Sequence, residues 1–174
     1  MSPVPRHVRA VVGTLFVMAA CSHTPPPRSG PMADPAIARD VEQIRAATAP
    51  FRDLAAAQAA GYPTATPQCL SNATAGGMGH HYVKRDIVDG RLDLEHPEIL
   101  LYAPAGEGKM KLVAVEYIIP YRILPPESEA PRILGQSLRQ SEPLKLWYLH
   151  VWAWEENPAG LFADWNPAVK CPAM

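Results

Sequence analysis

Residues 110–120 read MKLVAVEYIIP, and this stretch decides the fold class. It predicts a strand with apolar side chains on both faces, which is typical of a strand that is covered on both sides. EILLYA at 98–103 predicts a second strand, and PAGEGK at 104–109 predicts a hairpin connection between the two. These strands are expected to pair antiparallel inside the protein.

Two more strands are expected. LKLWYLHVWAWE at 144–155 is dense in aromatic and β-preferring residues, and a further strand begins at His80 and runs to residue 84 after a turn-rich segment. Residues 121–143 contain four prolines and mixed charges, which indicates a long surface loop with a short helical turn at 134–139.

Helices are expected before the strands. Asp34 followed by a proline is typical of a helix start, and apolar residues recur at helical spacing until 48. The Ala-rich segment 51–60 predicts a second helix that Gly61 ends. Helices followed by mainly antiparallel strands predict an α+β fold, in one domain over residues 34–174.

The N-terminal residues 1–20 are typical of an export signal. Arg6 and Arg9 precede an apolar stretch at 10–20 that is too short to span a bilayer stably. Small residues directly before Cys21 resemble the processing site of bacterial lipoproteins, in which this thiol is lipidated. We therefore expect a lipid-anchored protein on the periplasmic side of a bacterial membrane, with secretion as the alternative.

A flexible tether is expected at residues 21–33, which are rich in proline and serine. Ser22, rather than an aspartate, follows the lipidation residue, which favours the outer membrane. Lipidation of Cys21 leaves Cys69 and Cys171, an even number in an oxidising compartment, and predicts a disulfide between them.

Several functional classes lack support. The formal net charge is −1 and no basic cluster occurs, so nucleic acid is not expected as a partner. No phosphate-binding loop or dinucleotide fingerprint is present, and neither Ser71 nor Ser137 lies in a nucleophile-elbow context.

Two polar residues interrupt the apolar strands. Glu116 lies in VAVEYII and His150 in WYLHVWAW. A buried carboxylate needs a cation, a proton or strong hydrogen bonds, so each residue indicates either a site or an internal polar network. By strand alternation, the residues expected on the same face are Leu112, Ala114 and Ile118 for Glu116, and Tyr148, Trp152 and Trp154 for His150.

A metal site is expected if the sheet brings Glu116 and His150 close to the strand that begins at His80. His80 and His81 lie on opposite faces of that strand, so at most one of them meets Glu116 and His150. We favour His81, with His80 as the alternate. Two imidazoles and a carboxylate suit a mononuclear divalent transition metal site, with zinc first and copper second.

Other interpretations stay open. The polar residues also fit a structural network in an interaction module of the cell envelope, and the face of Tyr148, Trp152 and Trp154 also fits a small-molecule pocket. Met78 is a possible soft ligand but is more typical of a core residue, and His96 is a possible fourth ligand that more simply ends a turn. Catalysis stays undecided; Glu116 would then be the general base.

Four segments carry a resemblance: GMGHHYV at 77–83, LVAVEYIIP at 112–120, LHVWAWEENPAGLFADWNP at 149–167 and VKC at 169–171. Together they resemble a family of bacterial exported proteins and lipoproteins, over about residues 51–171. The resemblance implies export and supports the domain boundaries, and it implies no particular activity.

Overall fold

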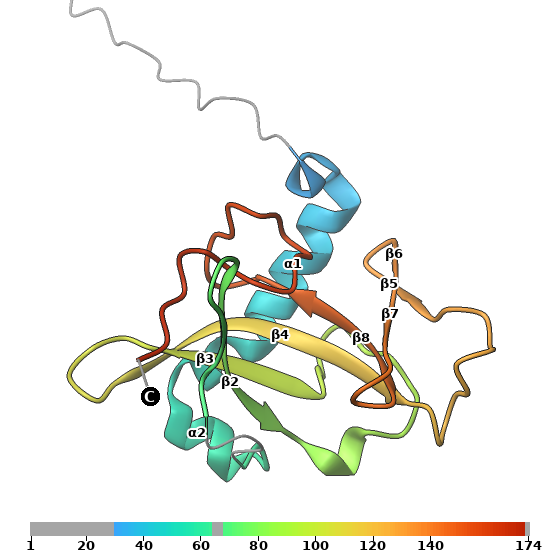
Figure 1. Cartoon of the computed structure of the whole chain (residues 1–174), viewed down its shortest axis with the longest axis horizontal. Helices are drawn as coiled ribbons and strands as arrows, with labels where there is room; N and C mark the ends of the chain where they lie inside the picture. The colour runs from blue at the N-terminus through green and yellow to red at the C-terminus, as the bar shows by residue number, and fades with distance from the viewer. Residues whose placement is uncertain (1–29, 64–67, 173–174) are drawn as a thin grey trace, which may run out of the picture.

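The computed structural model describes residues 30–63 and 68–172, and these form an α+β fold in which two helices precede a curled, mainly antiparallel sheet (Figure 1). The helices are α1 (Pro35–Thr48) and α2 (Leu54–Ala59), with short 3-10 turns η1 (Pro31–Ala33), η2 (Ala49–Arg52) and η3 (Arg85–Ile87). The strands are β1 (Leu70–Asn72), β2 (Gly76–Val83), β3 (Ile99–Pro104), β4 (Met110–Pro120), β5 (Arg132–Ile133), β6 (Gln136–Ser137), β7 (Arg139–Ser141) and β8 (Leu146–Val151).

The expected signal peptide, the lipidation residue Cys21 and most of the expected tether lie outside the described residues. Within the part that is described, no helix is long and apolar enough to cross a membrane. Export and lipid anchoring therefore stay predictions.

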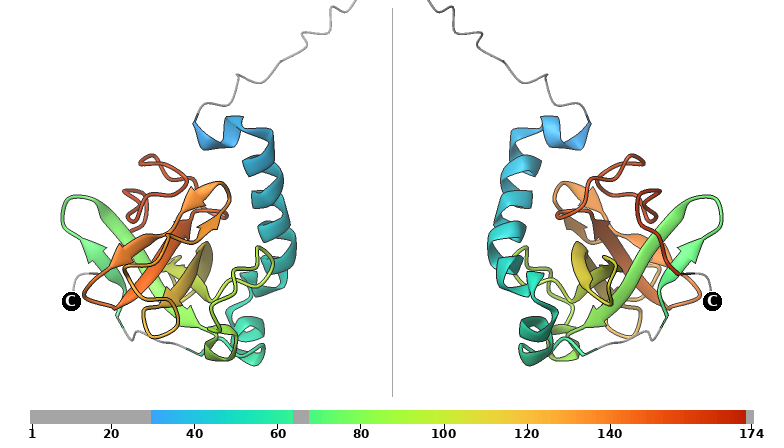
Figure 2. Two further views of the ribbon diagram at one scale, coloured as in Figure 1. Left: turned by 90° about the vertical axis from the view of Figure 1, so that its right-hand side faces the viewer. Right: turned by 90° about the vertical axis from the view of Figure 1, so that its left-hand side faces the viewer.

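The helices begin where their capping residues are. The Asp34 side chain accepts a hydrogen bond of 2.8 Å from the Ala36 amide, which fixes the start of α1. Asp53 caps α2 in the same way, so this helix begins later than the sequence indicated. Figure 2 shows α1 along one side of the strands, where its residues Val41 and Ile44 are fully buried.

The main sheet has six strands in the order β1-β2-β3-β4-β8-β7, with β4 inside it between β3 and β8. One face packs against the helices through residues such as Leu100 and Val115. The other face contains Leu101 and Ala114 and is covered by residues of the C-terminal segment, including Val169. The run MKLVAVEYIIP is thus buried on both faces, as its apolar pattern predicted.

A bulge in β4 corrects one prediction about its faces. Leu101 pairs with Ala114, whereas Tyr102 pairs with Leu112, so Val113 is an extra residue on β4. An extra residue reverses the alternation of side chains beyond it. Leu112 therefore packs in the helix-side core rather than on the face of Glu116.

The segment 121–143 contains no helical turn within 134–139, and that expectation was wrong. Strands β5 and β6 form a small hairpin instead, and β7 adds to the edge of the sheet beside β8. Leu134 and Gly135 have φ values of 50° and 69°, the positive pair that a tight type I′ hairpin turn requires. Leu134 and Leu138 are buried, so the segment also contributes to the core.

The predicted disulfide between Cys69 and Cys171 is present. It joins the residue before β1 to the C-terminal segment, with the two Cα atoms 5.6 Å apart. Such a bond fits a protein outside the reducing cytosol, in the periplasm or the extracellular space.

Candidate metal site

Strands β4 and β8 place two polar residues directly opposite each other. Glu116 pairs with His150 in the antiparallel register, and both side chains project from the face that lies away from α1. Glu116 is 6% exposed and His150 is 1% exposed. His150 Nε2 lies 3.3 Å from Glu116 Oε1.

His81 reaches the same place from β2. In a flat sheet, β2 and β4 would lie about 9–10 Å apart, because β3 separates them and neighbouring strands are about 4.7–4.9 Å apart. The curl of the sheet and the length of the two side chains close this gap, and His81 Nε2 lies 3.6 Å from Glu116 Oε2. His81 is 8% exposed, so all three side chains are buried.

The cluster of His81, Glu116 and His150 could hold a metal ion. One ligand atom from each residue can be chosen so that all three lie within 4.8 Å of one another. Zinc bonds to nitrogen and oxygen are about 2.0–2.1 Å long, which places neighbouring ligand atoms of a tetrahedral site about 3.3–3.4 Å apart. His150 Nε2 lies 3.3 Å from Glu116 Oε1, close to this spacing, whereas His81 Nε2 lies 3.6 Å from the other carboxylate oxygen, Oε2.

The other candidate ligands lie elsewhere. His80 pairs with Tyr102, whose side chain is in the helix-side core, so His80 projects from the opposite face to His81. His96 is exposed, and its Nδ1 is 2.9 Å from Asp93 Oδ2 at a turn. Met78 packs against the apolar residues on the face of Glu116.

Asp164 is a partner of this cluster that was not included in the predicted ligand set. Its FADWNP context is typical of a turn and gave only weak support for a place beside the site, but the structure places Oδ1 3.6 Å from His150 Nδ1. Tyr148 donates a hydrogen bond of 3.2 Å to Oδ2, and Arg139 Nη2 forms an ion pair of 2.7 Å with Oδ1. His150 therefore lies between two carboxylates, one beside each ring nitrogen.

The charges of the cluster follow from burial and proximity. Burial alone disfavours a charged His150, but Glu116 and Asp164 outweigh it and raise the pKa of His150 to about 9. Burial likewise opposes charge on Glu116, and the two histidines reverse this and lower its pKa. Burial lowers the pKa of His81. Without a metal, the cluster at neutral pH holds one carboxylate, one imidazolium and one neutral imidazole.

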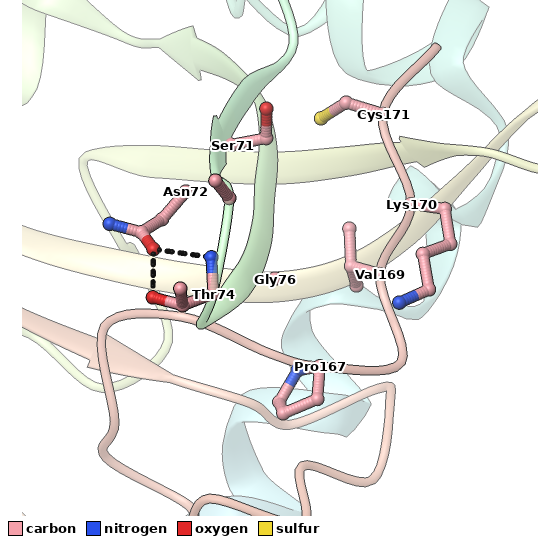
Figure 3. Close-up of a pocket in the computed structure, with 9 residues that line it drawn as sticks. Ser71, Asn72, Thr74, Gly76, Pro167, Val169, Lys170 and Cys171 are labelled. Atoms are coloured by element: carbon pink, nitrogen blue, oxygen red, sulfur yellow. Dashed lines mark hydrogen bonds between the residues drawn. The ribbon is translucent and has the colours of Figure 1, made fainter. Parts of the chain in front are cut away.

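An aromatic pocket on the face of His150 is not formed as expected. Strand β8 ends at Val151, and Trp154 Nε1 donates a hydrogen bond of 3.0 Å to Thr48 on α1. Trp154 therefore lies on the helix side, whereas Trp152 is buried on the face of the cluster. Figure 3 shows a surface hollow beside the disulfide that is lined in part by Asn72 and Lys170, and none of the three cluster residues lines it.

Glu98 is a second buried carboxyl group that sequence reasoning missed. It directly precedes β3, is 1% exposed, and its Oε2 accepts a hydrogen bond of 3.2 Å from the Ile118 amide. Burial raises its pKa from 4.5 to about 8, with smaller contributions from Asp89 and Glu116. At neutral pH this carboxyl keeps its proton in the folded protein.

Glu98 gives the stability a pH dependence. In the unfolded chain this carboxyl loses its proton near pH 4.5, whereas the folded protein holds it until about pH 8. Unfolding between these values releases a proton, so rising pH destabilises the fold. Between pH 5 and pH 7, Glu98 should cost the wild type about 2 kcal/mol of its free energy of unfolding. The Glu98→Gln variant should not show this loss, because its amide can still accept from Ile118 but carries no titrating proton. Urea unfolding of both proteins at the two pH values measures this, and identical slopes would contradict it.

Comparisons with models of protein families, with curated proteins and with solved structures found no match to this chain. The resemblance to exported bacterial proteins therefore stays a prediction.

Proposed function

We propose that this protein binds one divalent transition metal ion through His81, Glu116 and His150. The observation that carries the proposal is the convergence of these three buried side chains, which come from three different strands. Three protein ligands leave a coordination position for water or another donor. The nearby carboxylate of Asp164 is engaged by Arg139 and Tyr148, and we assign it no catalytic role, so we favour binding, storage or delivery of the ion over catalysis.

The donor set favours zinc. Imidazole and carboxylate ligands suit Zn²⁺, and imidazole also suits Cu²⁺, which is the alternative ion. The two described cysteines form the disulfide, so neither of them supplies a thiolate ligand for monovalent copper.

The compartment belongs to the same proposal. We propose an exported protein, anchored to a bacterial membrane through a lipid on Cys21, with the site on the periplasmic side. The disulfide supports an oxidising compartment. Lipid anchoring itself has only the sequence pattern of the first 21 residues as support.

One observation favours a second candidate, an internal polar network in a cell-envelope module. Glu116 and Asp164 can together hold His150 as an imidazolium without any metal, which would satisfy the buried charges. The two candidates differ in what metal does to the protein. A polar network gains nothing from zinc, whereas a binding site gains stability from it.

Metal uptake tests the proposal. After removal of bound metal with a chelator and reconstitution with zinc, we expect elemental analysis to find about one equivalent in the wild-type protein. His150→Ala and Glu116→Gln each remove a ligand and should hold less than about a tenth of an equivalent. His96→Ala is the matched control, because this histidine is exposed and distant from the cluster in the fold, and it should bind like the wild type.

Thermal unfolding distinguishes the two candidates. Zinc at about 100 times its dissociation constant should stabilise the wild type by about 2.7 kcal/mol and leave Glu116→Gln unchanged. A wild-type protein that takes up less than about a tenth of an equivalent, and whose unfolding midpoint does not move with zinc, would show that the cluster is only a structural network.

A further inference from the structure

We propose that Asp164 is a positioning residue that orients His150 for metal binding and is itself held by Arg139 and Tyr148. The inference rests on the proposed function and adds a residue outside the ligand set. It concerns the side of the imidazole that faces away from Glu116, where Asp164 Oδ1 lies 3.6 Å from Nδ1.

The geometry separates the two ring nitrogens of His150. Nε2 faces Glu116 at 3.3 Å, and Nδ1 faces Asp164. The residue is 1% exposed, and neither ring nitrogen has a partner at full hydrogen-bond geometry. A histidine that ligates through Nε2 needs its proton on Nδ1, and a carboxylate beside Nδ1 fixes that tautomer and the orientation of the ring. A shift of less than about 1 Å brings Nδ1 and Oδ1 to hydrogen-bond distance.

Two contacts hold Asp164 beside the imidazole, and the two residues that make them also contact each other. Arg139 Nη2 lies 2.7 Å from Oδ1, and the Tyr148 hydroxyl donates to Oδ2 at 3.2 Å. Arg139 and Tyr148 pair across β7 and β8, and the guanidinium carbon lies 5.2 Å from the centre of the Tyr148 ring. The arrangement links the edge of the sheet to the cluster.

The backbone on either side of Asp164 is also fixed. Trp152 Nε1 donates a hydrogen bond of 2.6 Å to the Ala163 carbonyl. Asn166 forms a β-bridge with Gly77 at the start of β2. The backbone around Asp164 is thus attached to β2, which supplies His81, and to the residue that directly follows β8, the strand of His150. An Asp164 with a purely local role in a turn would need none of these contacts.

The matched control is Glu155. Its carboxylate forms an ion pair of 2.7 Å with Lys111, and its side chain is 26% exposed, compared with 28% for Asp164. Glu155→Ala therefore removes an ion pair of similar length and exposure that has no contact with His150. A general effect of losing one carboxylate would appear in both variants.

The test is zinc affinity, measured by competition with a chromogenic chelator. We expect Asp164→Ala to bind zinc about 10–100 times more weakly than the wild type, and Glu155→Ala to bind like the wild type. Asp164→Asn should recover part of the loss, because its amide oxygen can still accept from Nδ1. Cobalt in place of zinc supplies a spectroscopic readout: the visible absorption bands should change in Asp164→Ala and stay unchanged in Glu155→Ala.

Equal affinity and equal cobalt spectra in the wild type and Asp164→Ala would overturn the inference and leave the proposed function standing. Equal losses in Asp164→Ala and Glu155→Ala would overturn it as well. A wild-type protein that binds no metal would remove the proposed function and this inference together. If Asp164→Ala fails to fold, Asp164→Asn decides: a zinc affinity below that of the wild type, with Glu155→Ala unchanged, supports the inference, and wild-type affinity with wild-type cobalt bands overturns it.

Discussion

Replacing both Cys69 and Cys171 with serine is expected to lower the free energy of unfolding by about 4–5 kcal/mol. The disulfide joins residues 102 positions apart, and in the chain-entropy model a loop of this size restricts the unfolded chain by about that amount. Typical domains are stable by only about 5–15 kcal/mol, so the loss is a large part of the total. Urea unfolding of the wild type and the double variant measures it.

Treatment of the wild-type protein with a thiol reductant is the control for the serine side chains. It should shift the unfolding midpoint in the same direction and by a similar amount. A difference of less than about 1 kcal/mol between the wild type and the double variant would show that the contacts of the C-terminal segment, rather than the covalent bond, hold it in place.

Replacing Gly79 with alanine is the second large effect that we expect, a loss of about 3–5 kcal/mol of stability. Gly79 has a φ of 98°, a conformation that side chains disfavour, and a Cβ atom there would lie 2.5 Å from the Tyr102 carbonyl oxygen. The residue lies on β2, pairs with Leu70 of β1 and directly precedes His80, the first residue of β2 that pairs with β3. Strain and the backbone clash therefore add.

Gly160→Ala is the matched control for Gly79→Ala. Gly160 has a φ of 117°, but a Cβ atom there would meet nothing within 4 Å. It should lose only about 1–2 kcal/mol, the cost of the backbone conformation. Thermal or urea unfolding of both variants separates the two contributions, and equal losses would show that the contact with Tyr102 relaxes.

The sequence predicted the element types well because hydrophobic periodicity is a local property. Strand alternation was also enough to separate His81 from His80, since the two sides of β2 face different layers. The same rule failed for Leu112 because of the bulge in β4. The bulge arises in the pairing with β3 and could not be inferred from the residues around Leu112. The helical turn expected at 134–139 was wrong for another reason: a hairpin forms there, and Leu134 takes a positive φ that is unusual for leucine.

The candidate site was predictable only in part. Glu116 and His150 stood out because each is a polar residue in an apolar strand, but their meeting with His81 depends on the strand order and on the curl of the sheet. Asp164 was missed because the path of an irregular segment cannot be read from periodicity. Glu98 was missed because it directly precedes β3, where a charged residue usually faces water.

The three residues of the cluster are spread over the sequence, so they can meet only late in the synthesis of the chain. A ribosome that has released the chain only as far as β4 has exposed His81 and Glu116 but not His150 or its neighbour Asp164. Since N-terminal parts emerge first, the nascent chain offers no complete ligand set until β8 has joined β4. Under the proposed function, occupancy by an ion would mark a finished tertiary structure, because an unfolded chain has no comparable means of retaining the ion.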